Sequence, residues 1–524
     1  MLNFLVIYQY RSLILFRNHK VPKQTKNEKC MPKQYEEQII ELQNRFSRRG
    51  IALHRPYPPK HPILTLSKFG GCPNLPHSID WPYCIDPHDD TLTAPLHFLM
   101  QINCCELPEE QTQLPKTGGL FFFARMDEES IWDDKQNAKG DVRVIYVEGF
   151  DKSTPPRRPP PDTFQIYSNK KPETEDFILP TKTYLSFDQK RLIVHPEEEQ
   201  VFPEWPMEIV PFDSFAEADE LRSELPTTLQ GDDKYTFMDT YHSIRQDRVK
   251  LSVQANLAEA GLSADIEAPA VKSSEPQTKE DPAISKQKEL MPWLHMPEQI
   301  ADVLPQLAVF PLEIAAHLGQ HIKKGIQTFE RSSEPSDEVL GALKKNFEQV
   351  ALWISRLKGF ESTHLISRSE ADEFLTWLSF MANQTYLIKH TRLFGADRGK
   401  INIIARPVLK IHKPYWEAVS QIVRKCAVSA ELYAAMPDQF FEYPKRCTNT
   451  FSDIGTNEPH QMLSYFPSSQ DSFDIHSSKI HLLYLHSDDA LNFRFWDCGE
   501  ATFFIPPEDL TDKNMGRAWA SIQG

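Results

Sequence analysis

The densest motif in this 524-residue chain is LSKFGGCPNLP, at residues 66–76. Its two adjacent glycines predict a turn that needs positive φ or a close approach of the backbone to another segment. A second motif-rich block runs HSDDALNFRFWDCG, at residues 486–499 near the other end of the chain. Because both blocks combine turn residues with aromatic residues, we expect the two ends of the chain to build β structure together.

Composition and charge restrict the class of protein. Hydrophobic residues make up 40% and charged residues 25%, which is typical of a globular protein with a sizeable core, and the length allows roughly two to four domains. The formal net charge of -15 argues against a nucleic-acid-binding protein, because phosphate binding needs a clustered cationic face. The eight cysteines show no zinc or disulfide spacing. We therefore expect reduced thiols, a cytoplasmic location, no cofactor and no resident metal.

The first thirty residues need their own interpretation. The apolar segment 2–16 is too short to span a bilayer, which takes about 20 apolar residues, and it lacks the flanks of a signal peptide. An amphipathic helix begins after Met31, with Tyr35, Ile39, Leu42 and Phe46 on one face. We expect Met31 to be the true start and residues 1–30 to be a misassigned or disordered extension. A weak membrane anchor is the alternative.

Residues 31–212 are expected to form the first part of a β-rich domain. Its short segments are rich in aromatic and β-branched residues and are separated by prolines and turns. The predicted strands are 96–102, 120–124, 142–147, 163–167 and 191–194. The proline-rich run 155–161 is expected to be an extended surface loop, with a ligand for a proline-recognising domain as the alternative.

The middle of the chain changes to helical patterns. Residues 213–262 predict a polar helical connection, and the aromatic-free residues 263–290 predict a disordered linker. Residues 291–455 are expected to be a largely α-helical insertion. Its apolar stripes indicate a bundle core rather than a cofactor site, and the third helix is expected to begin with a capping box of Ser369 and Asp372. The four stripes are Ile314/Leu318/Ile322/Ile326, Val339/Leu343/Phe347/Val350/Ile354, Phe374/Trp377/Leu378/Met381 and Trp416/Val419/Val423/Cys426.

Residues 456–524 return to β character and predict strands at 480–486 and 501–505. HFL at 97–99, followed by a glycine turn and FFF at 121–123, is similar to HLL at 481–483, followed by Gly499 and FFI at 503–505. This similarity predicts two related β units of one sheet system. The helical block is then a long insertion in a single α+β domain.

The end blocks resemble the YwqG-like family, a mostly bacterial set of proteins classed as a domain of unknown function. The resemblance covers roughly residues 35–212 and 456–520, and it implies antiparallel β units with flanking helices in an α+β fold. The chain departs from the family pattern in its long helical insertion and in its paired cysteines, Cys104-Cys105. The residues that carry the resemblance are SKFGGCP (67–73), LP (75–76), WP (81–82), PLHFLMQIN (95–103), HQ (460–461), SDD (487–489), Trp496 and Gly499.

The candidate ligand or interaction residues lie in the two motif blocks. They are Lys68, Gly70, Gly71, Gln101, His460, Gln461, Asp488, Asp489, Trp496 and Asp497. The glycine pair fits neither the P-loop nor the dinucleotide fingerprint, so a turn is favoured over a phosphate cradle.

The acidic and histidine candidates each allow two interpretations. Asp488 and Asp489, with Asp497 nearby, could hold Mg²⁺ or Ca²⁺ or act as general acid and base, but a strand-ending turn is favoured. His460 could be a general base, or it could only fix a loop through a hydrogen bond. The FFF run 121–123 predicts an exposed partner site if one of its faces meets solvent, and a buried strand if helices cover it.

We expect a cytoplasmic interaction protein that binds a protein or peptide in a groove between the two β units. Structural motifs are plentiful in the chain, and no recognisable catalytic signature is present. The alternative is a metal-assisted hydrolase or other small-molecule enzyme that uses His460 and the carboxylates of Asp488, Asp489 and Asp497. A third option assigns partner docking to the helical insertion, so that deletion of residues 263–450 abolishes partner capture.

Overall fold

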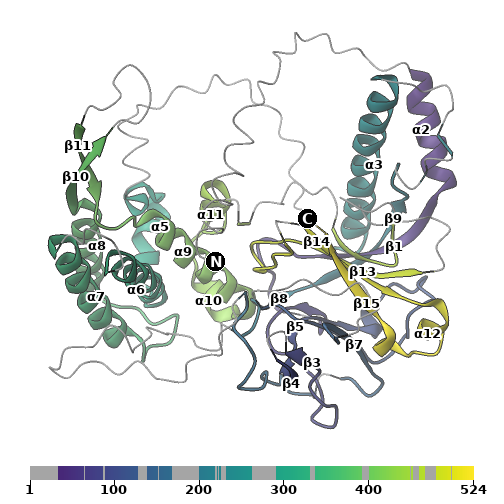
Figure 1. The fold of residues 1–524 in the computed structure, drawn as a ribbon, viewed down its shortest axis with the longest axis horizontal. Helices are drawn as coiled ribbons and strands as arrows, with labels where there is room; N and C mark the ends of the chain where they lie inside the picture. The colour runs from purple at the N-terminus through teal and green to yellow at the C-terminus, as the bar shows by residue number, and fades with distance from the viewer. Residues whose placement is uncertain are drawn as a thin grey trace.

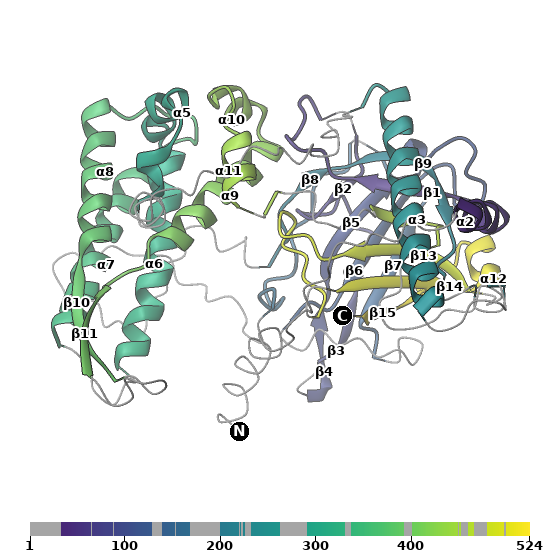
Figure 2. The same ribbon diagram turned by 90° about the horizontal axis from the view of Figure 1, so that it is seen from above.

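A computed structural model of the protein shows a helical part beside a β-rich part (Figures 1 and 2). The expected N-terminal extension, 1–30, and the expected linker, 263–290, lie outside the described residues. The described residues are 33–63, 65–86, 89–127, 139–151, 153–167, 200–218, 221, 224–225, 232–262, 291–330, 337–391, 401–448, 450–451, 459–465, 479–496 and 499–523.

A six-stranded antiparallel sheet joins the two ends of the chain. Its order is β15-β14-β13-β12-β1-β9, and Leu53 of β1 pairs with His460 of β12. The expectation that both ends of the chain contribute to one α+β unit is therefore confirmed. The strands are β1 (Ser47–His54), β9 (Glu208–Phe215), β12 (His460–Met462), β13 (Ile480–His486), β14 (Glu500–Ile505) and β15 (Trp519–Gln523).

A five-stranded antiparallel sheet has the order β7-β6-β5-β2-β8. Each sheet contains three strands that are consecutive in the sequence, β5 to β7 in this sheet and β13 to β15 in the other. In each sheet, the first of the three pairs on its other side with a short strand from earlier in the chain, β2 or β12. The pairing register shifts between Phe98 and Met100 in one hairpin and between His481 and Leu483 in the other. The predicted repeat is thus present, but its units form two sheets rather than one. The strands are β2 (Lys68–Phe69), β5 (His97–Asn103), β6 (Gly119–Ala124), β7 (Val142–Val147) and β8 (Trp205–Pro206).

The two sheets meet through packed aromatic side chains. Phe122 of β6 contacts Phe503 of β14 edge-to-face, with ring centroids 5.7 Å apart. On the other face of β6, Phe121 and Phe123 belong to a second apolar cluster beside the hairpin of β3 (Tyr83–Asp86) and β4 (Asp89–Pro95). All three phenylalanines are fully buried. Of the two interpretations of the FFF run, the strand buried on both faces is therefore the one that holds, although the β3–β4 hairpin rather than helices lies beside its second face. The groove expected between the β units is filled by core packing of the two sheets.

Helices α2 (Lys33–Arg45) and α3 (Asp232–Glu259) lie beside the β9 edge of the six-stranded sheet (Figure 1). Ile39 of α2 and Tyr241 of α3 are fully buried in the same cluster, so the amphipathic face predicted after Met31 does cover core. The short α12 (Pro507–Thr511) connects β14 to β15.

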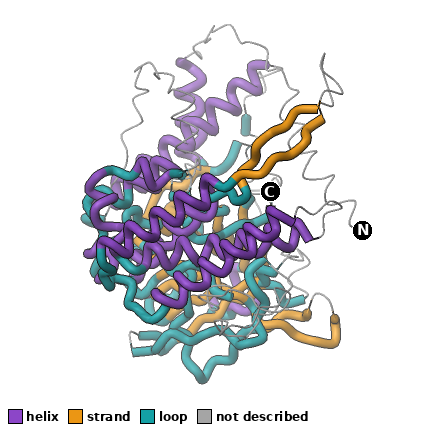
Figure 3. Tube along the Cα trace, turned by 90° about the vertical axis from the view of Figure 1, so that its left-hand side faces the viewer, coloured by secondary structure: helices purple, strands orange, loops and turns teal. Residues whose placement is uncertain are grey.

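The helical part is built from the predicted apolar stripes. Their side chains are buried, apart from the partly buried Trp377. A hairpin of β10 (Thr385–Thr391) and β11 (Ile401–Pro407) projects from this part (Figure 3, orange, upper right) and was not predicted. The helices are α5 (Glu298–Val303), α6 (Val309–Glu330), α7 (Asp337–Leu357), α8 (Arg368–Asn383), α9 (His412–Val428), α10 (Ala430–Ala435) and α11 (Glu442–Cys447).

Two local predictions need correction, and one cannot be compared. Residues 163–167 form no strand, because their backbone bonds to loops and side chains: Tyr167 N donates to Met126 O, and Gln200 Nε2 donates to Thr163 O. The capping box of α8 consists of Ser367 and Glu370, two residues earlier than predicted. The predicted strand 191–194 lies outside the described residues. None of the helices in the described residues combines the length and the apolarity that a bilayer-spanning segment requires.

Candidate functional site

A cleft of about 1170 Å³ lies between the helical part and the β part. One wall is formed by α6 and α9, and the opposite side is formed by loop residues 201–204 and by Asp489 and Asn492. Phe202, Pro203 and Trp416 supply apolar surface, while lysine, arginine, histidine and glutamate side chains supply polar groups. The cleft therefore presents both apolar and charged surface to a ligand.

The helical wall is a ladder of polar side chains between two antiparallel helices. Lys425 Nζ of α9 lies 2.9 Å from Glu313 Oε1 of α6. Two turns along α6, His321 Nε2 lies 2.8 Å from Glu417 Oε2. Residues four apart share one face of a helix, so the spacing of 313 to 321 and of 417 to 425 brings these pairs into line. Burial alone would raise the pKa of Glu417, but the hydrogen bond and charge of His321 outweigh burial and lower it.

His317 lies between these two pairs and also lines the cleft. Its Nδ1 is buried and has no hydrogen-bond partner in the described part of the chain. Burial lowers the pKa of His317 below its usual value, and the carboxylates of Glu313 and Glu417 offset part of that effect. The ring is therefore neutral near pH 7, and its buried Nδ1 presents no exposed surface to a ligand.

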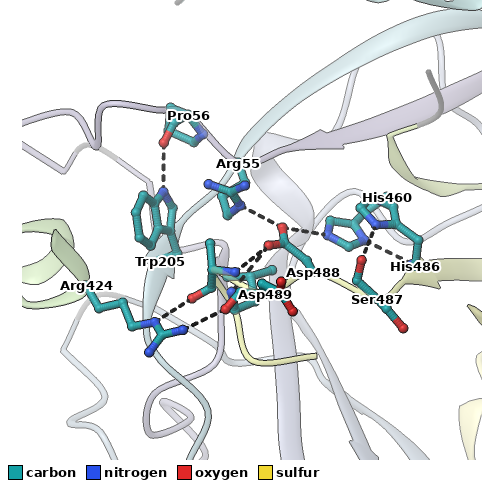
Figure 4. A network of polar contacts seen from close by, with 11 residues as sticks. Arg55, Pro56, Trp205, Arg424, His460, His486, Ser487, Asp488 and Asp489 are labelled. Carbon is teal, nitrogen blue, oxygen red and sulfur yellow. Dashed lines mark hydrogen bonds and ion pairs between the residues drawn. The ribbon is translucent and has the colours of Figure 1, made fainter. Parts of the chain in front are cut away.

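Arg424 ties the helical wall to the floor of the cleft (Figure 4). Its Nη2 donates to Asp489 O at 2.6 Å, and its Nε donates to Ala490 O at 3.0 Å. These charge-assisted bonds hold the turn after β13 against α9. Asp489 therefore contributes its backbone to the junction between the two parts.

Asp488 holds the same turn from below. Its Oδ1 accepts from Ala490 N at 2.8 Å, and its Oδ2 accepts from Arg55 Nε at 2.7 Å. Burial alone would raise the pKa of Asp488, but the Arg55 guanidinium and the nearby histidines hold it far below its usual range. The carboxylate is thus ionised at neutral pH, and it serves as a turn cap and an ion-pair partner.

His460 lies against this carboxylate, stacked on His486 with ring centroids 3.9 Å apart. Its Nδ1 accepts from His486 N at 3.3 Å, so the proton of the neutral ring is on Nε2, which faces Asp488 Oδ2 at 3.6 Å. Burial lowers the pKa of His460, and it lowers that of His486 to about 3. Because His460 is only 2% exposed, this pair does not reach the cleft.

The glycine motif forms a tight turn next to the loop that borders the cleft. Gly70 and Gly71 have φ of 56° and 67°. A Cβ on Gly70 would lie 2.2 Å from Pro203 O, and one on Gly71 would lie 1.9 Å from Glu204 Oε2. Their amides already donate to Leu99 O and Phe202 O, so they do not form a phosphate cradle. Lys68 Nζ pairs with Glu204 at 2.8 Å.

The remaining candidates from the sequence do not meet at this site. Gln101 is buried and bonds to the backbone of Asn74 and Leu66, which fixes the loop after the glycine turn. Gln461 is also fully buried, and Trp496 is 55% exposed with a positive φ. Asp497 lies outside the described residues.

Of the ten candidates, the structure places Gly71 and Asp489 on the cleft and brings His460 and Asp488 together beneath it. Sequence reasoning missed Arg55, which is 433 positions from its partner and carries no local signal. It also missed the α6 wall, although Glu313, His317 and His321 recur every four residues and could have indicated a polar face opposite the apolar stripe.

A comparison with protein families gives one match. A family model described as a domain of unknown function, DUF1963, matches residues 67–259 and 378–523. The matched segments include α9 and both loops of the cleft, whereas α6 lies between them. The match starts later than the resemblance at the N-terminal side and extends further into the helical part. No curated protein matches the chain.

Proposed function

The chain belongs to the DUF1963, or YwqG-like, family, and we propose that this protein is a binding module for a segment of another polypeptide. The family description carries no activity, so the proposal depends on the geometry of the cleft. The observation that supports it is the size of the cleft together with its two-sided wall. At about 1170 Å³, it exceeds the roughly 300–1,000 Å³ typical of pockets for small molecules.

Hydrogen bonds connect the two sides of the cleft, so the site is already formed before a ligand enters. Arg424 bonds two carbonyls of the β part, and Tyr57 Oη donates to Phe441 O of the helical part at 2.6 Å. A preformed site costs less ordering free energy when a ligand enters. The helical insertion thus acts as one wall of the site, which agrees with the docking role considered from the sequence.

The enzyme alternative has less support from the same geometry. Catalysis needs reactive side chains to converge where a substrate can reach them. His460 and Asp488 converge, but both are 2% exposed and are committed to Arg55 and to the backbone. A binding module is therefore the better account of these residues, which position the floor of the cleft.

We also place the protein in the cytoplasm. Among the described residues, Cys84, Cys104 and Cys426 are buried thiols that form no disulfide. Burial raises the pKa of Cys84 and of Cys104 to about 12, so both are protonated and poorly reactive at neutral pH. Such thiols fit a reducing compartment.

A selection from a random peptide display library tests the proposal. The full chain is the bait, and each enriched peptide is then measured against Gln320→Trp, which adds bulk at an exposed cleft position of α6. Leu352→Trp on α7, also exposed and outside the cleft lining, is the matched control. We expect the peptides to bind wild type and the control equally and to lose at least tenfold in affinity for Gln320→Trp. Failure to enrich any peptide, or equal binding to all three proteins, would overturn the proposal.

A further inference from the structure

The charges along the helical wall change from balanced to basic with distance from the β part. Nearest the β part, Glu313 and Lys425 form a pair whose side chains are 2% and 20% exposed. Further out, Glu417 pairs with His321 at 2.8 Å and with Lys413 at 3.7 Å. One carboxylate is therefore shared between two basic side chains.

The outer end of the wall has more basic groups than acidic ones. Lys324 lies one turn beyond His321 on α6, it is exposed, and it makes no ion pair with any residue that the structure describes. Lys413 is 74% exposed, and His412 beside it also lines the cleft. We call Lys324, Lys413 and His412 the basic mouth. Among the described residues, Glu417 is the single carboxylate paired to a member of this set.

This basic mouth contrasts with the net charge of the protein. The whole chain carries a formal charge of -15, so a long polyanion meets net electrostatic repulsion from the protein. A short acidic segment can avoid that repulsion and still place one or two carboxylates between the lysines. Charge complementarity of this kind sets partner choice and association rate.

We propose that the polypeptide segment held in the cleft is acidic, with its carboxylates paired to Lys324 and Lys413 at the basic mouth. This inference rests on the proposed function, since it assigns the ligand chemistry of the same cleft. The apolar surface of Phe202, Pro203 and Trp416 accommodates the neighbouring part of the segment.

The peptides from the display selection test this assignment separately from the cleft itself. The most enriched peptide is synthesised in two forms, as selected and with every Asp and Glu replaced by Asn and Gln. We expect enrichment of acidic residues, and weaker binding of the neutral form.

The protein variants provide the second readout. We expect the double variant Lys324→Gln, Lys413→Gln to bind the acidic peptide several-fold more weakly, at about two- to fivefold for each lysine, and with a smaller dependence on NaCl concentration. The control is Lys250→Gln, Lys345→Gln, which makes the same change in net charge at exposed positions on α3 and α7.

The outcomes are distinguishable. The acidic assignment would be overturned if the peptides blocked by Gln320→Trp are neutral or basic. It would also be overturned if they bind the Lys324→Gln, Lys413→Gln variant and the control variant equally. Either result would leave the cleft as the binding site. Peptides that ignore Gln320→Trp would overturn the proposed function itself. Inhibition by polyphosphate as strong as that by the acidic peptide would show a nonspecific cationic surface, and it would also overturn the assignment.

Discussion

Arg55 and Asp488 are 433 residues apart in the chain, yet Arg55 Nε donates to Asp488 Oδ2 at 2.7 Å in the interior (Figure 4). Arg55 follows β1, and Asp488 follows β13. The other oxygen of the same carboxylate caps the turn whose carbonyls receive Arg424 of α9. A single carboxylate thus connects the end of β1, the end of β13 and the turn that forms the floor of the cleft.

Loss of this carboxylate charge should strongly destabilise the protein. Asp488→Asn keeps an oxygen for the turn amides but leaves the guanidinium of Arg55 buried without a counter-charge. Breaking a buried pair in this way costs about 3–5 kcal/mol, whereas removing both charges costs much less. We therefore expect urea denaturation to show a large loss for Asp488→Asn and a substantial recovery in the double variant Arg55→Met, Asp488→Asn.

The same experiment can refute the structural role of the pair. If the two substitutions add, so that the double variant is less stable than either single variant, the two side chains do not depend on one another.

The glycine turn should tolerate no side chain. Gly70→Ala would hold alanine at a φ of 56° and bring its Cβ to 2.2 Å from the backbone oxygen of Pro203. A left-handed backbone costs a non-glycine residue roughly 1–2 kcal/mol, and the clash with the backbone adds to this cost. We expect a loss of more than about 2 kcal/mol in the free energy of unfolding. Gly149→Ala is the matched control because nothing lies within 4 Å of its Cβ, and a similar loss there would contradict this explanation.

The start of α8 gives a test within one turn of helix. Ser367 Oγ accepts from Glu370 N at 3.2 Å, and Glu370 Oε2 accepts from Ser367 N at 3.0 Å. Ser367→Ala should cost about 1 kcal/mol of stability, whereas Ser369→Ala, inside the first turn, should stay within about 0.5 kcal/mol of wild type. If thermal or urea unfolding instead shows the larger loss of stability for Ser369→Ala, the capping box predicted from the sequence, Ser369 and Asp372, would be the correct one.

Stability should fall with acid because several histidines are buried in the neutral form. His97 accepts from Met126 N at Nδ1 and donates to Phe164 O through Nε2, and burial lowers its pKa to about 4. The unfolded chain binds this proton near pH 6.5, well before the folded protein does. The stabilisation is therefore complete above about pH 6.5 and decreases as the pH falls towards 4, by roughly 3 kcal/mol for this one residue.

Urea denaturation between pH 7 and pH 4.5 measures this effect as a slope. His97→Phe should be less stable overall, because it loses two hydrogen bonds. The slope of its free energy of unfolding against pH should correspond to an uptake on unfolding of about one proton fewer than in wild type. An unchanged slope would show that His97 does not titrate as described.

The elements with a strong local pattern could be predicted from the sequence. The strands β6, β7, β13 and β14, the helix α2 and the four long helices of the helical part agree with the sequence pattern to within a few residues. Their periodicity reflects burial on one or both faces, which acts within each segment. The β10–β11 hairpin was missed because its residues follow α8 directly within a region that is otherwise helical.

The site could be predicted only in part, because its contacts are long-range. Asp488 and His460 were recognised as residues of interest, but their burial and their partner Arg55 depend on the assembly of β1 with β12. The wall of the cleft was hidden for another reason. The apolar stripes of α6 and α9 dominate their sequences, and the polar faces become a site only when the two helices lie antiparallel.

The most direct measurement of the central claim is hydrogen–deuterium exchange of the full chain with and without the most enriched display peptide. We expect protection in α6, in α9 and around residues 489–492, and no change in the β10–β11 hairpin or in α3. This pattern would place the ligand between the helical part and the β part. Protection confined to the hairpin or to the outer faces of the sheets, with α6 and α9 unchanged, would contradict the cleft as the functional site.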